Sequence, residues 1–237
     1  MEKKVLVYAD WVGLNGPTLV GTLHSVFSKN KEHFSFSYDD SWLISDQAQK
    51  IDPDLHLYAG PQHSINNKNF RSFLDSSPDR WGRLLMKRRE TLLARLEQRR
   101  PTALNDIDYL LGVHDTNRLG ALRFKLNADG PFLDNQTLLA TPPLSALREL
   151  EHASLQIETN PDTNDPDYVK WLYMLMAPGS SLGGARPKAS VIDERQQLWI
   201  AKFPSRYDEY DIAAWEYLTY RLAVTAGITM APSYIQR

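Results

Sequence analysis

Residues 180–188 read Ser-Ser-Leu-Gly-Gly-Ala-Arg-Pro-Lys, so a run of very small side chains is closed by a lysine. The segments 189–192 and 198–203 follow as two candidate strands, and Lys202 lies in the second. A loop of small residues lets backbone N–H groups approach phosphate oxygens, and a nearby lysine neutralises their charge. The segment is therefore a candidate nucleotide-phosphate loop. It lacks the Walker A spacing, and on the glycines alone a β-turn is the simpler interpretation.

Composition excludes several function classes. The chain has 237 residues, of which 42% are hydrophobic and 24% charged, which suits one large or two modest globular domains. A net charge of −2 gives no overall attraction to nucleic acid or to anionic membranes. The absence of cysteine excludes disulfides, thiolate metal sites and thiol nucleophiles. The six histidines are scattered without helical ligand spacing, so we expect no metal site.

The ends and hydrophobic runs of the chain favour a cytoplasmic protein. The first residues alternate as a strand does, and their apolar run is too short for a signal peptide. No apolar stretch approaches the length that a membrane span requires. We therefore expect no contact with a membrane.

The order of the expected elements predicts an α+β fold. Period-two alternation predicts antiparallel strands over 4–43, followed by an irregular segment over 44–69. We expect later elements as a strand over 119–126, helices over 105–111, 143–157, 169–176 and 212–227, and the opening of a strand over 233–237. The Pro- and Asp-rich stretch 159–167 is the clearest linker candidate. We divide the chain into a β-rich domain, 1–142, and a second unit, 143–237.

One predicted helix is rich in arginine. Ser77 suits the N-cap and Pro78 the first helical position, which places the helix start there. Its basic side chains are Arg80, Arg83, Lys87, Arg88, Arg89, Arg95, Arg99 and Arg100. A solvated helix face is the favoured interpretation, and a basic groove for a partner or for nucleic acid is the alternative.

The second unit has the element order of a protein-kinase small lobe. A small-residue loop is followed by a strand, a strand with Lys202, a helix with Glu216 and a further strand. Taken singly, Lys202 suits a strand edge, Glu216 a helix surface and Ser181 a turn. Only their order favours a shared site.

Several segments together resemble the HipA family of bacterial toxin serine/threonine kinases. The likeness is carried by Val20-Gly21-Thr22-Leu23, by 73–80 with its Ser-Pro-Asp helix start, by Leu110-Leu111-Gly112 with Leu119-Gly120-Ala121-Leu122, by the loop 181–188, by Trp199-Ile200-Ala201-Lys202-Phe203-Pro204, and by Glu216-Tyr217 with Leu222-Ala223 and Gly227-Ile228. The segments span nearly the whole chain in the family's order. The resemblance implies a β-rich domain followed by a kinase-like N-lobe, ending before the C-lobe.

The resemblance also implies roles for residues in the second unit. ATP phosphates would contact Gly183, Gly184, Ala185 and Lys188, and Lys202 would pair with the α- and β-phosphates. Glu216 would orient Lys202. Ser181 matches the family's autophosphorylated serine, with Ser180 as the neighbouring candidate. Phosphate there would add about two negative charges and oppose nucleotide binding.

Further implications concern cofactors and partners. The family binds ATP and Mg²⁺, and typically phosphorylates a serine of an aminoacyl-tRNA synthetase. Its usual partner is a small helix-turn-helix antitoxin (HipB-like), so DNA would be reached only indirectly.

The sequence departs from the family in lacking a C-lobe, so we assign no catalytic residue. A kinase takes its base aspartate and its metal ligands from that lobe. His114-Asp115-Thr116-Asn117 mimics a catalytic motif but precedes the phosphate loop, and we reject it. Three explanations stay open: the C-lobe is a separate chain or a lost fragment, the chain is a non-catalytic interaction protein, or it is a piece cut from a longer protein. We expect no kinase activity from this chain alone.

Overall fold

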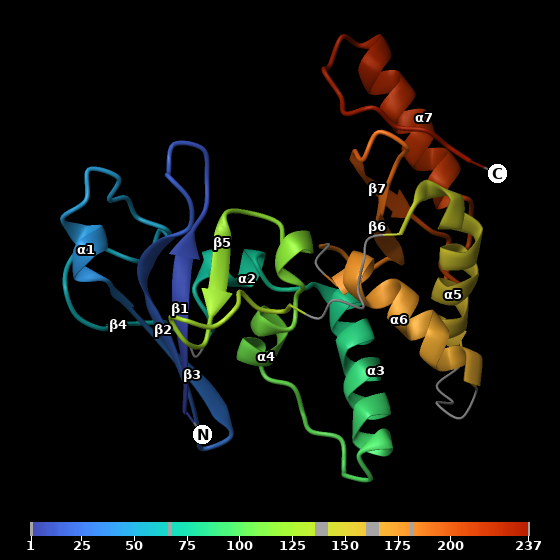
Figure 1. Cartoon of the computed structure of the whole chain (residues 1–237). Helices are drawn as coiled ribbons and strands as arrows, with labels where there is room; N and C mark the ends of the chain where they lie inside the picture. Colours follow the sequence, from blue (N-terminus) through green and yellow to red (C-terminus); the bar gives the residue numbers. More distant parts are fainter. Residues whose placement is uncertain (1, 66–67, 136–141, 160–165, 181–182, 237) are drawn as a thin grey trace.

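The computed structural model describes residues 2–65, 68–135, 142–159, 166–180 and 183–236. Its architecture is α+β, as the sequence predicts. A five-stranded antiparallel sheet has the order β4-β3-β2-β1-β5, and a separate antiparallel hairpin is formed by β6 and β7. Figure 1 shows the larger sheet to the left of the helix α3 and the hairpin above that helix.

The larger sheet is built from the first third of the chain and one later strand. Its strands are β1 (Glu2–Ala9), β2 (Thr18–Ser28), β3 (Lys31–Tyr38), β4 (Gln62–His63) and β5 (Leu122–Lys125). Alternation places Val5, Val7 and Ala9 of β1 on the buried face, with no exposed surface. The first three strands are confirmed. The strand predicted over 119–126 is observed as β5 and is shorter than expected.

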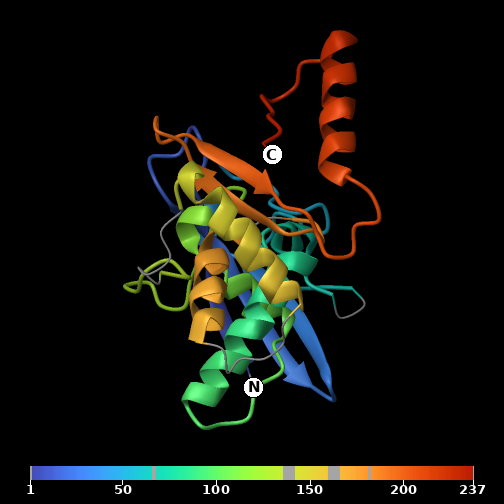
Figure 2. The ribbon, with the colours of Figure 1, turned by 90° about the vertical axis from the view of Figure 1, so that its right-hand side faces the viewer.

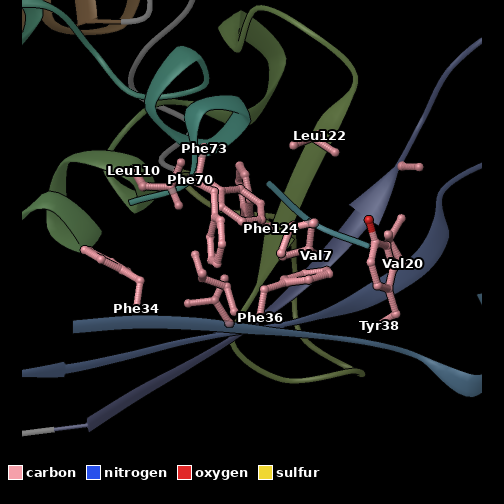
Figure 3. Packing of buried hydrophobic residues seen from close by; sticks show 14 of the residues in the cluster. Val7, Val20, Phe34, Phe36, Tyr38, Phe70, Phe73, Leu110, Leu122 and Phe124 are labelled. Atoms are coloured by element: carbon pink, nitrogen blue, oxygen red, sulfur yellow. The ribbon is translucent and has the colours of Figure 1, made fainter. Parts of the chain in front are cut away.

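Short helices cover the buried face of this sheet. They include α1 (Asp40–Leu43), α2 (Arg71–Asp75) and α4 (Asp106–Leu111). Figure 3 shows Phe70 and Phe73 next to Phe36, Phe124 and Leu110. We call this cluster the sheet core. The Phe36 and Phe73 ring centroids are 5.7 Å apart, and those of Phe73 and Phe124 are 6.2 Å apart, distances at which aromatic rings attract.

A second cluster, the helical core, joins α3 (Arg80–Leu96), α5 (Leu147–Thr159) and α6 (Pro166–Ser180) to the hairpin of β6 (Lys188–Ile192) and β7 (Leu198–Lys202). A turn of 3₁₀ helix, η2 (Leu144–Ala146), leads into α5. Trp81, Leu85 and Met86 of α3 pack here with Leu175 and Val191. Residues on both sides of position 142 thus share one core, although the division at 142 itself stays a prediction.

A buried arginine ties the loops beside the sheet core. Arg118 donates hydrogen bonds to the backbone carbonyls of Ser76, Leu110, Val113 and Leu133 at 2.9–3.1 Å. Burial lowers the pKa of its guanidinium to about 10, so Arg118 stays charged at neutral pH. It follows η1 (Asp115–Asn117), whose Asp115 accepts from Arg123. The motif over 114–117, which resembles a catalytic loop and was rejected as one, therefore contributes Asp115 to an ion pair in the N-terminal half.

The helix α7 (Ile212–Thr225) projects away from the rest of the molecule (Figures 1 and 2). Asp211 caps its start, since its carboxylate accepts from the Ala214 amide at 2.9 Å. Gly227 follows its end with φ +81°, as expected of a C′ glycine. No residue of α7 is buried.

Some boundaries differ from the sequence expectations. Asp79, not Ser77, is the N-cap of α3, because its carboxylate accepts from the Arg80 amide. Residues 233–236 form no strand, so the strand expected over 233–237 is wrong there. Most of the predicted linker, 160–165, lies outside the described residues, and α6 begins at Pro166 within it. Across the described parts of the chain, no helix is both long and apolar enough to cross a membrane.

Candidate functional site

The β6–β7 hairpin places two lysines side by side. Lys188 begins β6 and Lys202 ends β7, and the two are direct partners in the antiparallel register. Directly opposed residues project their side chains on the same face of a sheet. Lys188 is buried and Lys202 is half exposed. The pair therefore makes a compact positive site at one end of the hairpin.

Helix α7 supplies a carboxylate to this site. The Nζ of Lys202 donates to Oε1 of Glu216 at 2.5 Å. Both side chains are about half exposed, at 52% and 51%. An exposed ion pair contributes little to stability, so this contact matters for where the lysine head group lies and not for the stability of the fold. This is the contact that an orienting role for Glu216 requires.

The loop residues Gly183, Gly184 and Ala185 precede the first lysine of this pair, separated from it by Arg186 and Pro187. The ammonium of Lys188 folds back and donates to the carbonyl of Gly183. Gly184 has φ +95°, a conformation that side chains disfavour, and a Cβ there would meet the Lys188 ammonium. The tight loop therefore depends on glycine at position 184 in particular.

The start of α3 holds the loop from the other side. The Gly184 N–H donates to Oδ2 of Asp79 at 2.7 Å, and the Gly184 carbonyl accepts from the Trp81 N–H at 3.2 Å. The Trp81 indole N–H also donates to the Lys188 carbonyl at 2.9 Å. Sequence reasoning missed Asp79 and Trp81 as site residues, because it treated the Ser-Pro-Asp segment only as a helix start.

Charge shapes the pKa values at the site. Burial, and then the nearby charge of Lys202, lower the pKa of Lys188 below its usual value. Hydrogen bonds from the Arg80 and Gly184 amides lower the pKa of Asp79. At neutral pH Asp79 is therefore an anion seated on the loop.

A second ion pair anchors the loop and was also not predicted. Arg186 donates two hydrogen bonds to Asp208, each 2.5 Å long, and this pairing lowers the pKa of Asp208. Asp208 also accepts from the Ser205 amide at 2.9 Å. The segment after β7 is thus tied to the loop before β6.

The two candidate phosphorylation sites fall where a range of described residues ends. Ser180 is the last residue of α6, and its side chain is not described. Ser181 lies outside the described residues. Their assignment stays a prediction.

The groups gathered here fit phosphate oxygens better than a cation. Two lysines and the loop amides are donors, and Glu216 is already paired with Lys202. Within the described ranges no three His, Asp or Glu side chains lie close enough together to hold a metal ion. The donors of the described residues thus suit an anion such as a polyphosphate.

A family model agrees with this part of the molecule. Residues 180–237 match the HipA-like C-terminal domain. The matched range contains the loop, the β6–β7 hairpin and α7. It supports a HipA-like relationship for the chain. No curated protein matches the sequence.

Proposed function

We propose that this chain is the N-terminal portion of a HipA-like serine/threonine protein kinase, and that its loop and lysine pair hold the phosphates of ATP. The observation that carries the proposal is the Lys202–Glu216 contact beside the glycine loop, within the range that matches the family model. In protein kinases a strand lysine held by a helix glutamate pairs with the α- and β-phosphates.

Each group has a defined part in this proposal. Lys202 neutralises the α- and β-phosphates while Glu216 fixes its position. Lys188 and the amides of Gly183, Gly184 and Ala185 contact phosphate oxygens. Phosphorylation of Ser181 or Ser180 would place negative charge beside the same loop and oppose nucleotide binding.

The rest of the reaction needs groups from another part of the kinase. A C-lobe, in the same protein or in a separate chain, would supply the base for the substrate hydroxyl and the ligands of Mg²⁺. The exposed apolar side chains of α7 offer a surface on which such a lobe would pack, and they include Trp215, Leu218 and Leu222. The substrate would then be a serine of a protein, of the aminoacyl-tRNA synthetase type.

Calorimetric titration of the 237-residue chain with ATP tests the nucleotide site. We expect Lys202→Ala to weaken ATP binding by about tenfold, since it removes one charge-assisted contact to phosphate. Lys170→Ala, an exposed lysine on α6, is the matched control and should bind ATP as the unchanged chain does. Equal ATP affinity in the Lys202→Ala and control variants would show that Lys202 has no such role.

A second candidate function is a non-catalytic interaction protein that binds a small helix-turn-helix antitoxin. The exposed apolar surface of α7 favours a binding role. Transfer of the γ-phosphate to a protein by the purified chain alone would refute it. Stable one-to-one binding of such an antitoxin, without ATP turnover, would support it.

Arginine-rich α3 gives little support to direct nucleic-acid binding. Arg83 and Arg89 of α3 already pair with Asp106 and Asp134, and Arg99, just after the helix, pairs with Glu90 and Glu97. Paired arginines lose much of their attraction for phosphate.

A further inference from the structure

The carboxylate of Asp79 occupies the glycine loop from a helix that lies about a hundred residues earlier in the chain. One oxygen, Oδ1, accepts from the Arg80 amide at 2.7 Å and caps α3. The other oxygen, Oδ2, accepts from the Gly184 amide, also at 2.7 Å. A capping side chain accepts from amides at the start of its own helix, and not from an amide of a distant loop. The second contact is therefore an additional feature that concerns the loop.

The carboxylate sits in the loop as a bound anion would. It takes up the N–H of Gly184, which has a positive φ, and the positive charge of Lys188 lies close enough to stabilise it. Lys188 in turn donates to the Gly183 carbonyl. The Gly184 amide and one N–H of the Lys188 ammonium are thus engaged within the chain.

We propose that Asp79 is an intramolecular competitor of the nucleotide phosphates at the glycine loop. A phosphate oxygen and the Asp79 carboxylate need the same Gly184 N–H, and two anions held at one amide repel each other. Binding of the phosphates therefore requires Asp79 to release the loop. This inference rests on the proposed function, because it describes the regulation of the same site.

The competition links nucleotide binding to the helical core. Asp79 is the N-cap of α3, and the next residues of that helix also hold the loop, through the Trp81 N–H on the Gly184 carbonyl and the Trp81 indole on the Lys188 carbonyl. Trp81 is buried in the helical core, so it keeps its place when the exposed Asp79 side chain swings away. The start of α3 thus sets how easily the loop becomes free for phosphate.

Asp79→Asn is the direct test, because asparagine caps helices as well as aspartate does but carries no charge. The measurement is the dissociation constant of the full 237-residue chain for ATP and for adenosine, by calorimetric titration. We expect Asp79→Asn to bind ATP about three- to tenfold more tightly, since a charge-assisted contact to the loop is lost. Adenosine has no phosphates, so its affinity should not change. Raised salt should shrink the difference for ATP.

Two further variants keep the test decisive. Asp75→Asn removes the same charge from an exposed position at the end of α2 and should leave the ATP affinity unchanged. Asp79→Ser keeps a good N-cap and serves if Asp79→Asn folds poorly. Unchanged or weaker ATP binding by the Asp79 variants, with wild-type binding intact, would overturn the competition and leave the proposed nucleotide site standing. Failure of every variant and of the wild type to bind ATP would overturn both proposals.

Discussion

At the scale of single residues, the two glycines of the loop differ in how well each position would accept a side chain. Gly184 has φ +95°, and a Cβ on it would meet the ammonium of Lys188. Gly183 has no atoms within 4 Å of the place where its Cβ would stand, and it is exposed. The sequence shows only a Gly-Gly pair, and the structure separates the constrained residue from the tolerant one.

This difference gives a matched pair of substitutions. We expect Gly184→Ala to lower the free energy of unfolding by about 1–3 kcal/mol, because alanine is strained at this φ and displaces Lys188. Gly183→Ala should change it by less than about 0.5 kcal/mol. Urea denaturation of both variants measures the difference. Equal effects of the two substitutions would mean that the loop does not hold the described conformation in solution.

The pairing of Lys188 with Lys202 does not stabilise the hairpin. Like charges directly opposed on neighbouring strands are destabilising, and the pKa of Lys188 is lowered by its burial and then by the charge of Lys202. Glu216 relieves the charge of Lys202, and Asp79 relieves that of Lys188. A polyphosphate would relieve both, which is why the pair supports the proposed function.

At the scale of elements, carboxylates make contacts at the start of α3 and near its end. Asp79 holds the loop at its start. Near its end Glu90 accepts two hydrogen bonds from Arg99, at 2.5 and 3.0 Å, and one from the Thr102 amide at 2.7 Å. The chain thereby turns back after α3 ends at Leu96. Glu90 thus fixes the direction in which the chain leaves the helix.

Glu90 makes the stability of this helix end depend on pH. Its hydrogen bonds with Arg99 lower its pKa from 4.5 to about 2. A carboxyl whose pKa is lower in the folded state stabilises the fold above pH 4.5, and this contribution is lost as the pH falls towards 2. We expect Glu90→Gln to be less stable than the unchanged chain at pH 6, and the gap to close below pH 4.5. Urea midpoints measured from pH 6 to pH 3 check this.

The control for this experiment is Glu149→Gln, which removes an exposed carboxylate from the first turn of α5. Its stability difference from the unchanged chain should show no comparable closing as the pH falls. A gap for Glu90→Gln that stays constant across the range would mean that the Glu90–Arg99 contact does not form in solution.

At the scale of the whole molecule, much of the fold could be predicted because it is encoded locally. Period-two alternation indicates the first three strands, and a helical pattern followed by Gly227 indicates α7 and its end. Neighbouring residues determine these features. The Lys202–Glu216 contact, 14 residues apart, was also expected, although only from the resemblance and not from a spacing rule.

The contacts that define the loop could not be predicted, because they join distant segments. Asp79 meets Gly184 across 105 residues, and Trp81 meets Lys188 across 107. A Ser-Pro-Asp segment is fully explained by helix capping, so nothing in its residue types indicates a second role. The packing of α3 in the helical core could not be predicted for the same reason. An amphipathic pattern shows that one face of a helix is buried, but not which elements cover it.

The exposed apolar surface of α7 also belongs to the whole-molecule scale. Leu218 and Leu222 are 47% and 61% exposed, one turn apart on the helix, and neither lies in the sheet core or the helical core. Exposed apolar surface of this kind promotes association.

If α7 stands free in solution, the double variant Leu218→Gln/Leu222→Gln should lower self-association without a large loss of stability, about 0.5 kcal/mol or less for each change. The paired substitution Ile44→Gln/Leu57→Gln, also at exposed apolar residues, should leave association unchanged. Sedimentation velocity gives the first quantity and urea denaturation the second. A large loss of stability in the α7 variant would show instead that this face is packed in solution, and the surface proposed for a C-lobe would then be already covered.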